Sequence, residues 1–126
     1  MIGESLSALS AGLKFWKDRG QQQVNEKRRR DAAIGTVMDA AIATKSYLHD
    51  RSEGRLEDRE KEHQIARLWQ AAANAILEYD HQLFNSARLK ALGWSDPSEW
   101  RRSTGREWVI KIDNIIEQCD WLQRNG

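Results

Sequence analysis

The sequence predicts an all-α fold, an antiparallel helical bundle of about four main helices with a short additional helix near residues 95–101. Three observations lead to this prediction. Apolar residues recur at the 3.6-residue spacing of an α-helix in several stretches, the alternating pattern of strands is rare, and Pro97 is the only proline. With 126 residues, of which 40% are hydrophobic and 31% charged, the chain is expected to form a single domain over residues 1–126.

The first twenty residues carry a narrow apolar stripe, in which large residues recur at alternating steps of 4 and 3. The stripe consists of Ile2, Leu6, Leu9, Leu13 and Trp16, and Phe15 adds bulk beside it. Such steps form the heptad pattern by which helices pair in coiled coils. Residues 1–20 are therefore expected to form an amphipathic helix, which either docks on a partner or belongs to the core. This helix either stops at Gly20 or continues through it.

A second helical pattern runs from about Val24 to Leu48. Its expected inner face consists of Ile34, Val37, Met38, Ala41 and Leu48, with Ala33, Ala40 and Tyr47 beside them. Gly35 suggests the close approach of another helix, and Gly54 is placed to act as a C-cap. The charged residues 51–62 are expected to face solvent.

The most regular helical face lies between Ile65 and Tyr79, and the bundle is expected to form around it. Its apolar residues are Ile65, Leu68, Trp69, Ala72, Ile76 and Tyr79. Asp80 is predicted to cap the next helix, because its carboxylate can accept backbone N–H groups left free at a helix start. This helix is expected to end at Gly93, and its lining residues are Leu83, Phe84, Ala87 and Leu92.

Two capping-box patterns follow, each a helix-start signal in which side chains satisfy free backbone N–H groups. Residues 96–99 (Asp-Pro-Ser-Glu) predict the short helix, and residues 104–107 (Thr-Gly-Arg-Glu) predict the start of the last helix. The apolar face of that last helix is expected to contain Trp108, Ile112, Ile115, Ile116, Cys119 and Leu122.

Residues that could carry chemistry are sparse. Glu60 and His63 form the one Glu-x-x-His pair, whereas carboxylate-bridged di-metal bundles need two such pairs and two further carboxylates. Cys119 lies on an apolar face, which favours a buried thiol over a nucleophile. The sequence therefore predicts no catalytic, cofactor or metal site and no small-molecule substrate, and the chain is not expected to be an enzyme.

Two basic clusters support an alternative function, nucleic-acid binding. The clusters are Lys27, Arg28, Arg29 and Arg30, and Arg101, Arg102 and Arg106. Four consecutive residues spread over about 300° of a helix, so they cannot all face one row of phosphates. The net charge of +1 also gives no general attraction to nucleic acid.

The favoured function is a non-enzymatic protein–protein interaction module, such as a small adaptor, accessory subunit or inhibitor, that binds another protein or itself. Tryptophan and arginine are enriched at protein interfaces, and the chain has six tryptophans. The expected partner-binding residues are Ile2, Leu6, Leu9, Leu13, Phe15, Trp16 and Trp121. Attachment of residues 1–20 to a membrane surface is a second alternative, although few positive charges accompany the stripe. A single cysteine and the lack of a signal-peptide pattern predict a cytoplasmic location.

Overall fold

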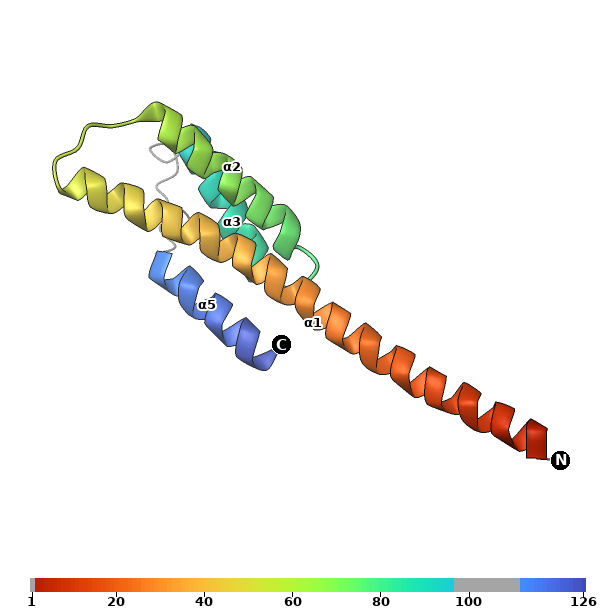
Figure 1. Cartoon of the computed structure of the whole chain (residues 1–126). Coiled ribbons are helices and arrows are strands. Elements are labelled where there is room, and N and C mark those ends of the chain that lie inside the picture. The colour runs from red at the N-terminus through yellow and green to blue at the C-terminus, as the bar shows by residue number, and fades with distance from the viewer. Residues whose placement is uncertain (1, 97–111) are drawn as a thin grey trace. The chain divides into compact units, whose positions relative to one another are not determined.

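The computed structural model describes residues 2–96 and 112–126, and it describes side chains from Gly20 onward. The described residues form four α-helices and no strand (Figure 1). The helices are α1 (Ile2–Ser52), α2 (Arg59–Ile76), α3 (His81–Ser95) and α5 (Ile112–Asn125). The all-α prediction is confirmed, while the antiparallel arrangement of the whole bundle stays a prediction. The short helix expected near residues 95–101 and the start of the last helix at residues 104–107 fall mainly outside the described residues.

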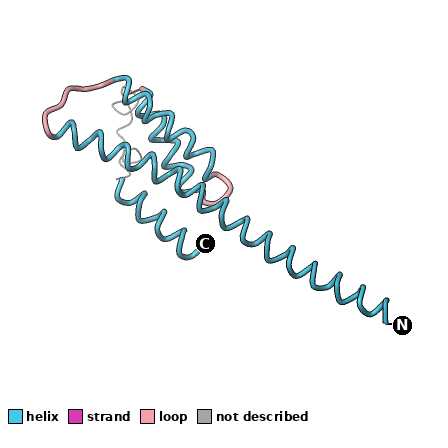
Figure 2. The backbone as a smooth tube through the Cα atoms, in the orientation of Figure 1, coloured by secondary structure: helices cyan, strands magenta, loops and turns pink. Residues whose placement is uncertain are grey.

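The chain divides into two compact units, Met1–Arg30 and Asp31–Gly126, and the boundary between them falls inside α1. α1 is one continuous helix of 51 residues, so Gly20 lies inside a helix (Figure 2). A Cβ atom built on Gly35 would meet no atom within 4 Å. The prediction that Gly35 marks a close helix contact is therefore wrong.

The C-terminal end of α1 is formed by a glycine cap, as predicted. Gly54 has a φ of 93°, a left-handed conformation that glycine adopts without the steric cost of a Cβ atom. Its N–H donates to the Arg51 carbonyl at 3.1 Å, and the Arg55 N–H donates to the Asp50 carbonyl at 3.0 Å. These two bonds form a Schellman motif, which satisfies carbonyls left free at a helix end.

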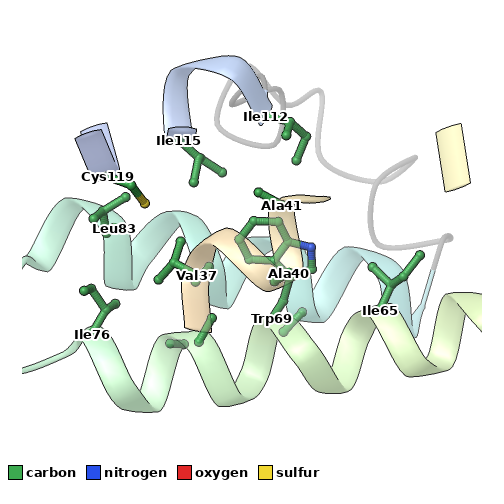
Figure 3. Close-up of a cluster of buried hydrophobic side chains, with 14 of the residues drawn as sticks. Val37, Ala40, Ala41, Ile65, Trp69, Ile76, Leu83, Ile112, Ile115 and Cys119 are labelled. Atoms are coloured by element: carbon green, nitrogen blue, oxygen red, sulfur yellow. The ribbon is translucent and has the colours of Figure 1, made fainter. Parts of the chain in front are cut away.

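The hydrophobic core lies within Asp31–Gly126 and receives side chains from all four helices (Figure 3). Its largest fully buried side chains are Trp69, Ile76, Leu83, Ile115 and Val37. Several alanines complete the core, and their small side chains let the helix backbones approach closely. These alanines are Ala33, Ala40, Ala41, Ala66, Ala72, Ala73, Ala87 and Ala91.

Three leucines predicted to be inner residues lie at the surface instead. Leu48, Leu68 and Leu92 are 47%, 37% and 45% exposed. On α1 the inner face contains Thr44 and Tyr47 in place of Leu48. The Thr44 hydroxyl donates to the Ala40 carbonyl and accepts from the Trp69 indole, both at 2.8 Å. A polar side chain whose donor and acceptor are both hydrogen-bonded can be buried at low cost. A prediction that uses side-chain polarity alone therefore assigns the wrong residues to this face.

The turn between α2 and α3 follows the predicted capping scheme. α2 ends at Ile76, three residues earlier than expected, and the N–H groups of Tyr79 and Asp80 both donate to the Ile76 carbonyl. The Asp80 carboxylate accepts the Leu83 N–H at 3.0 Å, which confirms Asp80 as the N-cap of α3. α3 continues past Gly93 to Ser95, so the prediction that it stops at Gly93 is wrong.

Candidate interaction surfaces

A buried polar cluster joins the end of α1 to the start of α2. The Tyr47 hydroxyl donates to Glu62 Oε2 at 2.6 Å and accepts the Asp58 N–H at 3.1 Å. Arg59 forms an ion pair with the other carboxylate oxygen of Glu62, and the Trp94 ring meets the Tyr47 ring edge-on at 5.6 Å. Burial raises the pKa of Tyr47, and the hydrogen bond to Glu62 raises it further.

Glu62 corrects the prediction that the charged segment 51–62 faces solvent throughout. Most of this segment is exposed, but Glu62 is only 5% exposed. Its position explains the exception, because α2 places it one turn before Ile65, on the face that packs against the core. The buried carboxylate has Arg59 as its ion-pair partner and accepts a hydrogen bond from Tyr47, so it links α2 to α1.

α5 is held against its neighbours at two points on its sides. Asp113 forms a 2.9 Å ion pair with Lys45 of α1 in an exposed position, and Gln118 donates a 3.0 Å hydrogen bond to Asp80 at the start of α3. The buried face between these points contains Ile112, Ile115, Cys119 and Leu122. All four were predicted to be apolar-face residues, and their burial confirms that part of the face.

Trp121 lies on the opposite side of α5 from this buried face. Its side chain is 51% exposed, an unusual position for the largest apolar side chain in proteins. Its role as a partner-binding residue stays a prediction. An exposed indole can contribute a large contact area and a hydrogen-bond donor to an interface.

A shallow groove of about 350 Å³ runs between α3 and α5 and has no charged lining residue. Its lining residues are Gln82, Leu83, Asn85, Ser86, Asn114, Ile115 and Gln118. Asn114, Gln118 and Trp121 follow one another at steps of 4 and 3, so they lie on the same side of α5. The lining of this flank is therefore uncharged and offers amide groups, and Trp121 lies on the same side of α5.

The predicted docking stripe lies on α1 inside the unit Met1–Arg30. The side chains of its residues, from Ile2 to Trp16, are outside the described part of the structure. The unit contains a single helix and no second element that could cover an apolar stripe. Where side chains are described in this unit, nearly all of residues 20–29 are exposed, including Val24 at 47%.

Three of the four side chains in the first basic cluster are exposed. Lys27, Arg28 and Arg29 are exposed, whereas Arg30 is half-buried and its Nε atom has no hydrogen-bond partner. The second cluster, Arg101, Arg102 and Arg106, lies outside the described residues. The structure therefore shows one basic segment at the surface.

The residues considered for a reactive or metal-binding role are Cys119, Glu60 and His63. Burial raises the pKa of the Cys119 thiol to about 11, and the charges of Asp120 and Asp80 add to the shift. A thiol with such a pKa is almost fully protonated at neutral pH and is a poor nucleophile. Glu60 and His63 are both exposed. No group of three or more potential metal-ligating His, Cys, Asp or Glu side chains occurs among residues 2–96 and 112–126.

Sequence reasoning missed one further buried charge, Lys90 of α3. The side chain is 9% exposed, and burial lowers its pKa. Helical spacing offers a signal for this position, because Lys90 lies seven residues after Leu83, two turns further along the same face. The position of a lysine on an apolar helical face indicates its burial, whereas the amino-acid composition does not.

Two further findings concern the chain more generally. None of the described helices combines the length and apolar character needed to cross a bilayer. Comparison of the chain with protein-family models, with curated proteins and with solved structures finds no match.

Proposed function

We propose that this protein is a non-enzymatic interaction module, a small adaptor, accessory subunit or inhibitor that binds another protein or itself through the stripe on α1. One observation carries the proposal. The unit Met1–Arg30 is a single helix, yet its sequence places five large apolar residues at heptad positions. A helix with such a stripe gains most of its stability by packing against another element.

The expected energy of docking supports this proposal. Burying a leucine-sized side chain contributes about 1.5–3 kcal/mol, so the stripe residues Ile2, Leu6, Leu9, Leu13 and Trp16 supply roughly 8–15 kcal/mol from one partner alone. Association costs on the order of 4–15 kcal/mol, and a partner helix adds its own buried area. The stripe is therefore large enough to drive association without a contribution from the bundle.

The rest of the chain gives secondary support. Trp121 is half-exposed on α5 beside the uncharged flank, and it provides a second contact point within Asp31–Gly126. Burial raises the pKa of the Cys119 thiol to about 11, so this thiol is a poor nucleophile at neutral pH. We place the protein in the cytoplasm as part of this proposal, because its one cysteine cannot form an internal disulfide.

The test compares two substitutions on opposite sides of the same helix. Leu9→Asp puts a charge in the stripe, whereas Ala11→Asp puts the same charge on the far side of α1. Light scattering of the pure protein and capture of partners by the tagged chain should show association for wild type and Ala11→Asp, and its loss for Leu9→Asp. Circular dichroism should show the bundle intact in all three. Equal association in all three, or an unfolded bundle in Leu9→Asp alone, contradicts the proposal.

A second candidate is nucleic-acid binding, which the exposure of Lys27, Arg28 and Arg29 favours. Phosphate contacts weaken steeply as salt rises, since binding releases condensed counterions. Fluorescence polarisation with labelled DNA and RNA, across a salt series, tests this candidate. Binding that falls with salt and is lost in a Lys27→Ala, Arg28→Ala, Arg29→Ala variant supports it, and absence of binding at low salt removes it.

A further inference from the structure

A second groove, between α2 and α3, gathers basic side chains. It has a volume of about 270 Å³, and its lining includes His63, Arg67, Gln70, Ala91, Leu92 and Ser95. Arg59, at the start of α2, pairs with Glu62 and also donates a 3.3 Å hydrogen bond to the Ser95 carbonyl, so it lies at one end of this groove. Arg88 is exposed on α3, one turn before Leu92 and on the same face of that helix. We call the surface formed by His63, Arg67, Arg88 and Leu92 the basic groove.

The positive charge of the basic groove is not neutralised within the described part of the chain. His63, Arg67 and Arg88 are exposed, and none of them takes part in an ion pair among residues 2–96 and 112–126. α3 contains no acidic residue, and both acidic residues of α2 lie in its first turn. The net charge of the whole chain is only +1, so this surface is a local concentration of positive charge.

The outer side of α5 carries the opposite charge. Asp113, Glu117 and Asp120 follow one another at steps of 4 and 3, so they share one side of the helix, and all three are exposed. Asp113 forms the ion pair with α1 described above, whereas Glu117 and Asp120 form none within the described residues. Trp121, 51% exposed, lies one turn after Glu117. Arg124 lies near the end of the helix, where its Nε donates to the Asp120 carbonyl. We call Glu117, Asp120 and Trp121 the acidic patch.

The basic groove and the acidic patch match in chemistry as well as in charge. Arginine pairs with carboxylates through several N–H groups, and its planar guanidinium also stacks on an indole ring. The groove also has an apolar part, because Leu92 is 45% exposed between the two helices and Ala66 and Ala91 line its base. Trp121 supplies an apolar surface that can cover Leu92. A row of phosphates would pair with the arginines but would leave this apolar part exposed to water.

From these observations we propose that the acidic patch of one copy of the chain docks in the basic groove of a second copy. Glu117 and Asp120 pair with Arg67 and Arg88, and Trp121 packs on Leu92. The contact joins two different surfaces, so it is heterologous and builds either a ring or an open row of copies. It goes beyond the proposed function, because it uses Asp31–Gly126 and not the stripe on α1.

Charge reversal in the full chain tests this contact. Every protein in the test carries Leu9→Asp, so that association through the stripe does not contribute. The groove variant adds Arg67→Glu and Arg88→Glu, and the patch variant adds Glu117→Lys and Asp120→Lys. Matched controls make the same charge changes at exposed positions elsewhere, with Arg28→Glu and Arg29→Glu, or with Glu53→Lys and Glu57→Lys.

Sedimentation velocity at low salt measures association over a concentration series. The parent should associate, and the groove and patch variants should each associate roughly tenfold more weakly or not at all. A 1:1 mixture of the two variants should associate again, because one of them keeps the patch and the other keeps the groove. This association should weaken as salt rises, since exposed charge pairs are screened. The two control variants should behave like the parent.

The outcomes support or overturn the contact independently of the stripe. Recovery of association in the mixture supports it. A parent that is monomeric at every concentration overturns it, and so do controls that weaken association as much as the groove and patch variants. A mixture that stays monomeric, with both variants folded by circular dichroism, also overturns it. If a reversed variant unfolds, Arg88→Gln and Glu117→Gln replace the reversals, and no weakening by either then overturns the contact. Binding of labelled DNA in the basic groove without self-association assigns that surface to nucleic acid instead.

Discussion

Two hydrogen-bonded aromatic residues show how polar atoms are accommodated inside the bundle. The Trp69 indole is fully buried and donates to Thr44, and the Tyr47 hydroxyl is shared between Glu62 and the backbone of Asp58. Each bond joins α1 to α2 or to the loop before it. Since a buried polar group without a partner costs about 1–3 kcal/mol, these bonds also specify which faces of the two helices meet.

Tyr47→Phe should lower the unfolding free energy by about 1–3 kcal/mol, because it removes the hydroxyl while leaving the Glu62 carboxylate buried. The chain provides a matched control in its other tyrosine. Tyr79 is half-buried against the core, and its hydroxyl has no hydrogen bond among the described residues. Tyr79→Phe should therefore change stability by less than about 0.5 kcal/mol. Urea unfolding followed by circular dichroism measures both, and equal losses would count against the role of the cluster.

Cys119 should weaken the fold at high pH. Its thiol has a pKa of about 11 in the bundle and 9.0 as the reference value, so the folded state keeps its proton to higher pH than the unfolded state. The contribution of the protonated thiol is complete below pH 9 and is lost as pH rises from 9 to about 11. Comparison with Cys119→Ala at each pH cancels the effects of Tyr47 and Lys90, whose pKa values are also shifted in the folded state.

The measurement is the difference in unfolding free energy between wild type and Cys119→Ala from pH 8 to pH 11. This difference should be constant up to pH 9 and should then shrink, since only the wild type loses the protonated thiol. A difference that stays constant over the whole range would show that the thiol ionises equally easily in both states.

At the scale of the helix, two glycines with similar open surroundings should respond in opposite ways to alanine. A Cβ atom on Gly35 or Gly54 meets nothing within 4 Å, but only Gly54 has a positive φ. Gly35→Ala should stabilise α1 by about 0.5–1 kcal/mol, because alanine has a higher helix propensity. Gly54→Ala should destabilise by about 1 kcal/mol through strain in the left-handed conformation. Thermal unfolding of the two variants checks the pair, and shifts of the same sign would contradict the cap geometry.

The start of α3 offers another helix-scale prediction. The Asp80 carboxylate caps α3 through the Leu83 N–H and also accepts a hydrogen bond from Gln118 of α5. Asp80→Ala should cost about 0.5–2 kcal/mol for the cap alone, and Gln118→Ala should cost less because the cap remains. In a double-mutant cycle the two losses should not be additive, since they share one hydrogen bond. Strict additivity would show that the α3–α5 bond contributes nothing.

Helix positions were predictable from the sequence where a strong local signal exists. The Asp80 N-cap and the Gly54 C-cap depend on backbone chemistry within a few residues, and the buried face of α5 depends on regular spacing. Leu48 and Glu62 were misplaced and the burial of Thr44 was not predicted, because partners on another helix decide which side chains are buried here. Gly20 could not be resolved from the sequence, because a glycine costs a long helix only about 1 kcal/mol and neighbouring turns compensate.

At the scale of the whole molecule, the two units use α1 in different ways. In Asp31–Gly126 the helix contributes buried residues such as Val37 and Ala40 to a core shared with α2, α3 and α5. In Met1–Arg30 the same helix is the sole element. Trp121 is exposed and the stripe lies on one unbroken helix, while the part of these residues in partner binding stays a prediction. The uncharged α3–α5 flank was missed because its residues come from segments far apart in the chain.

Residues 2–16 are proposed to serve association and not the bundle core. Deletion of residues 1–20, followed by light scattering and thermal unfolding of the shortened chain, separates these two roles. The shortened chain should keep a cooperative unfolding transition within about 1 kcal/mol of the full chain's stability per copy and should lose association. A shortened chain that is unfolded, or one that associates as strongly as the full chain, would contradict it.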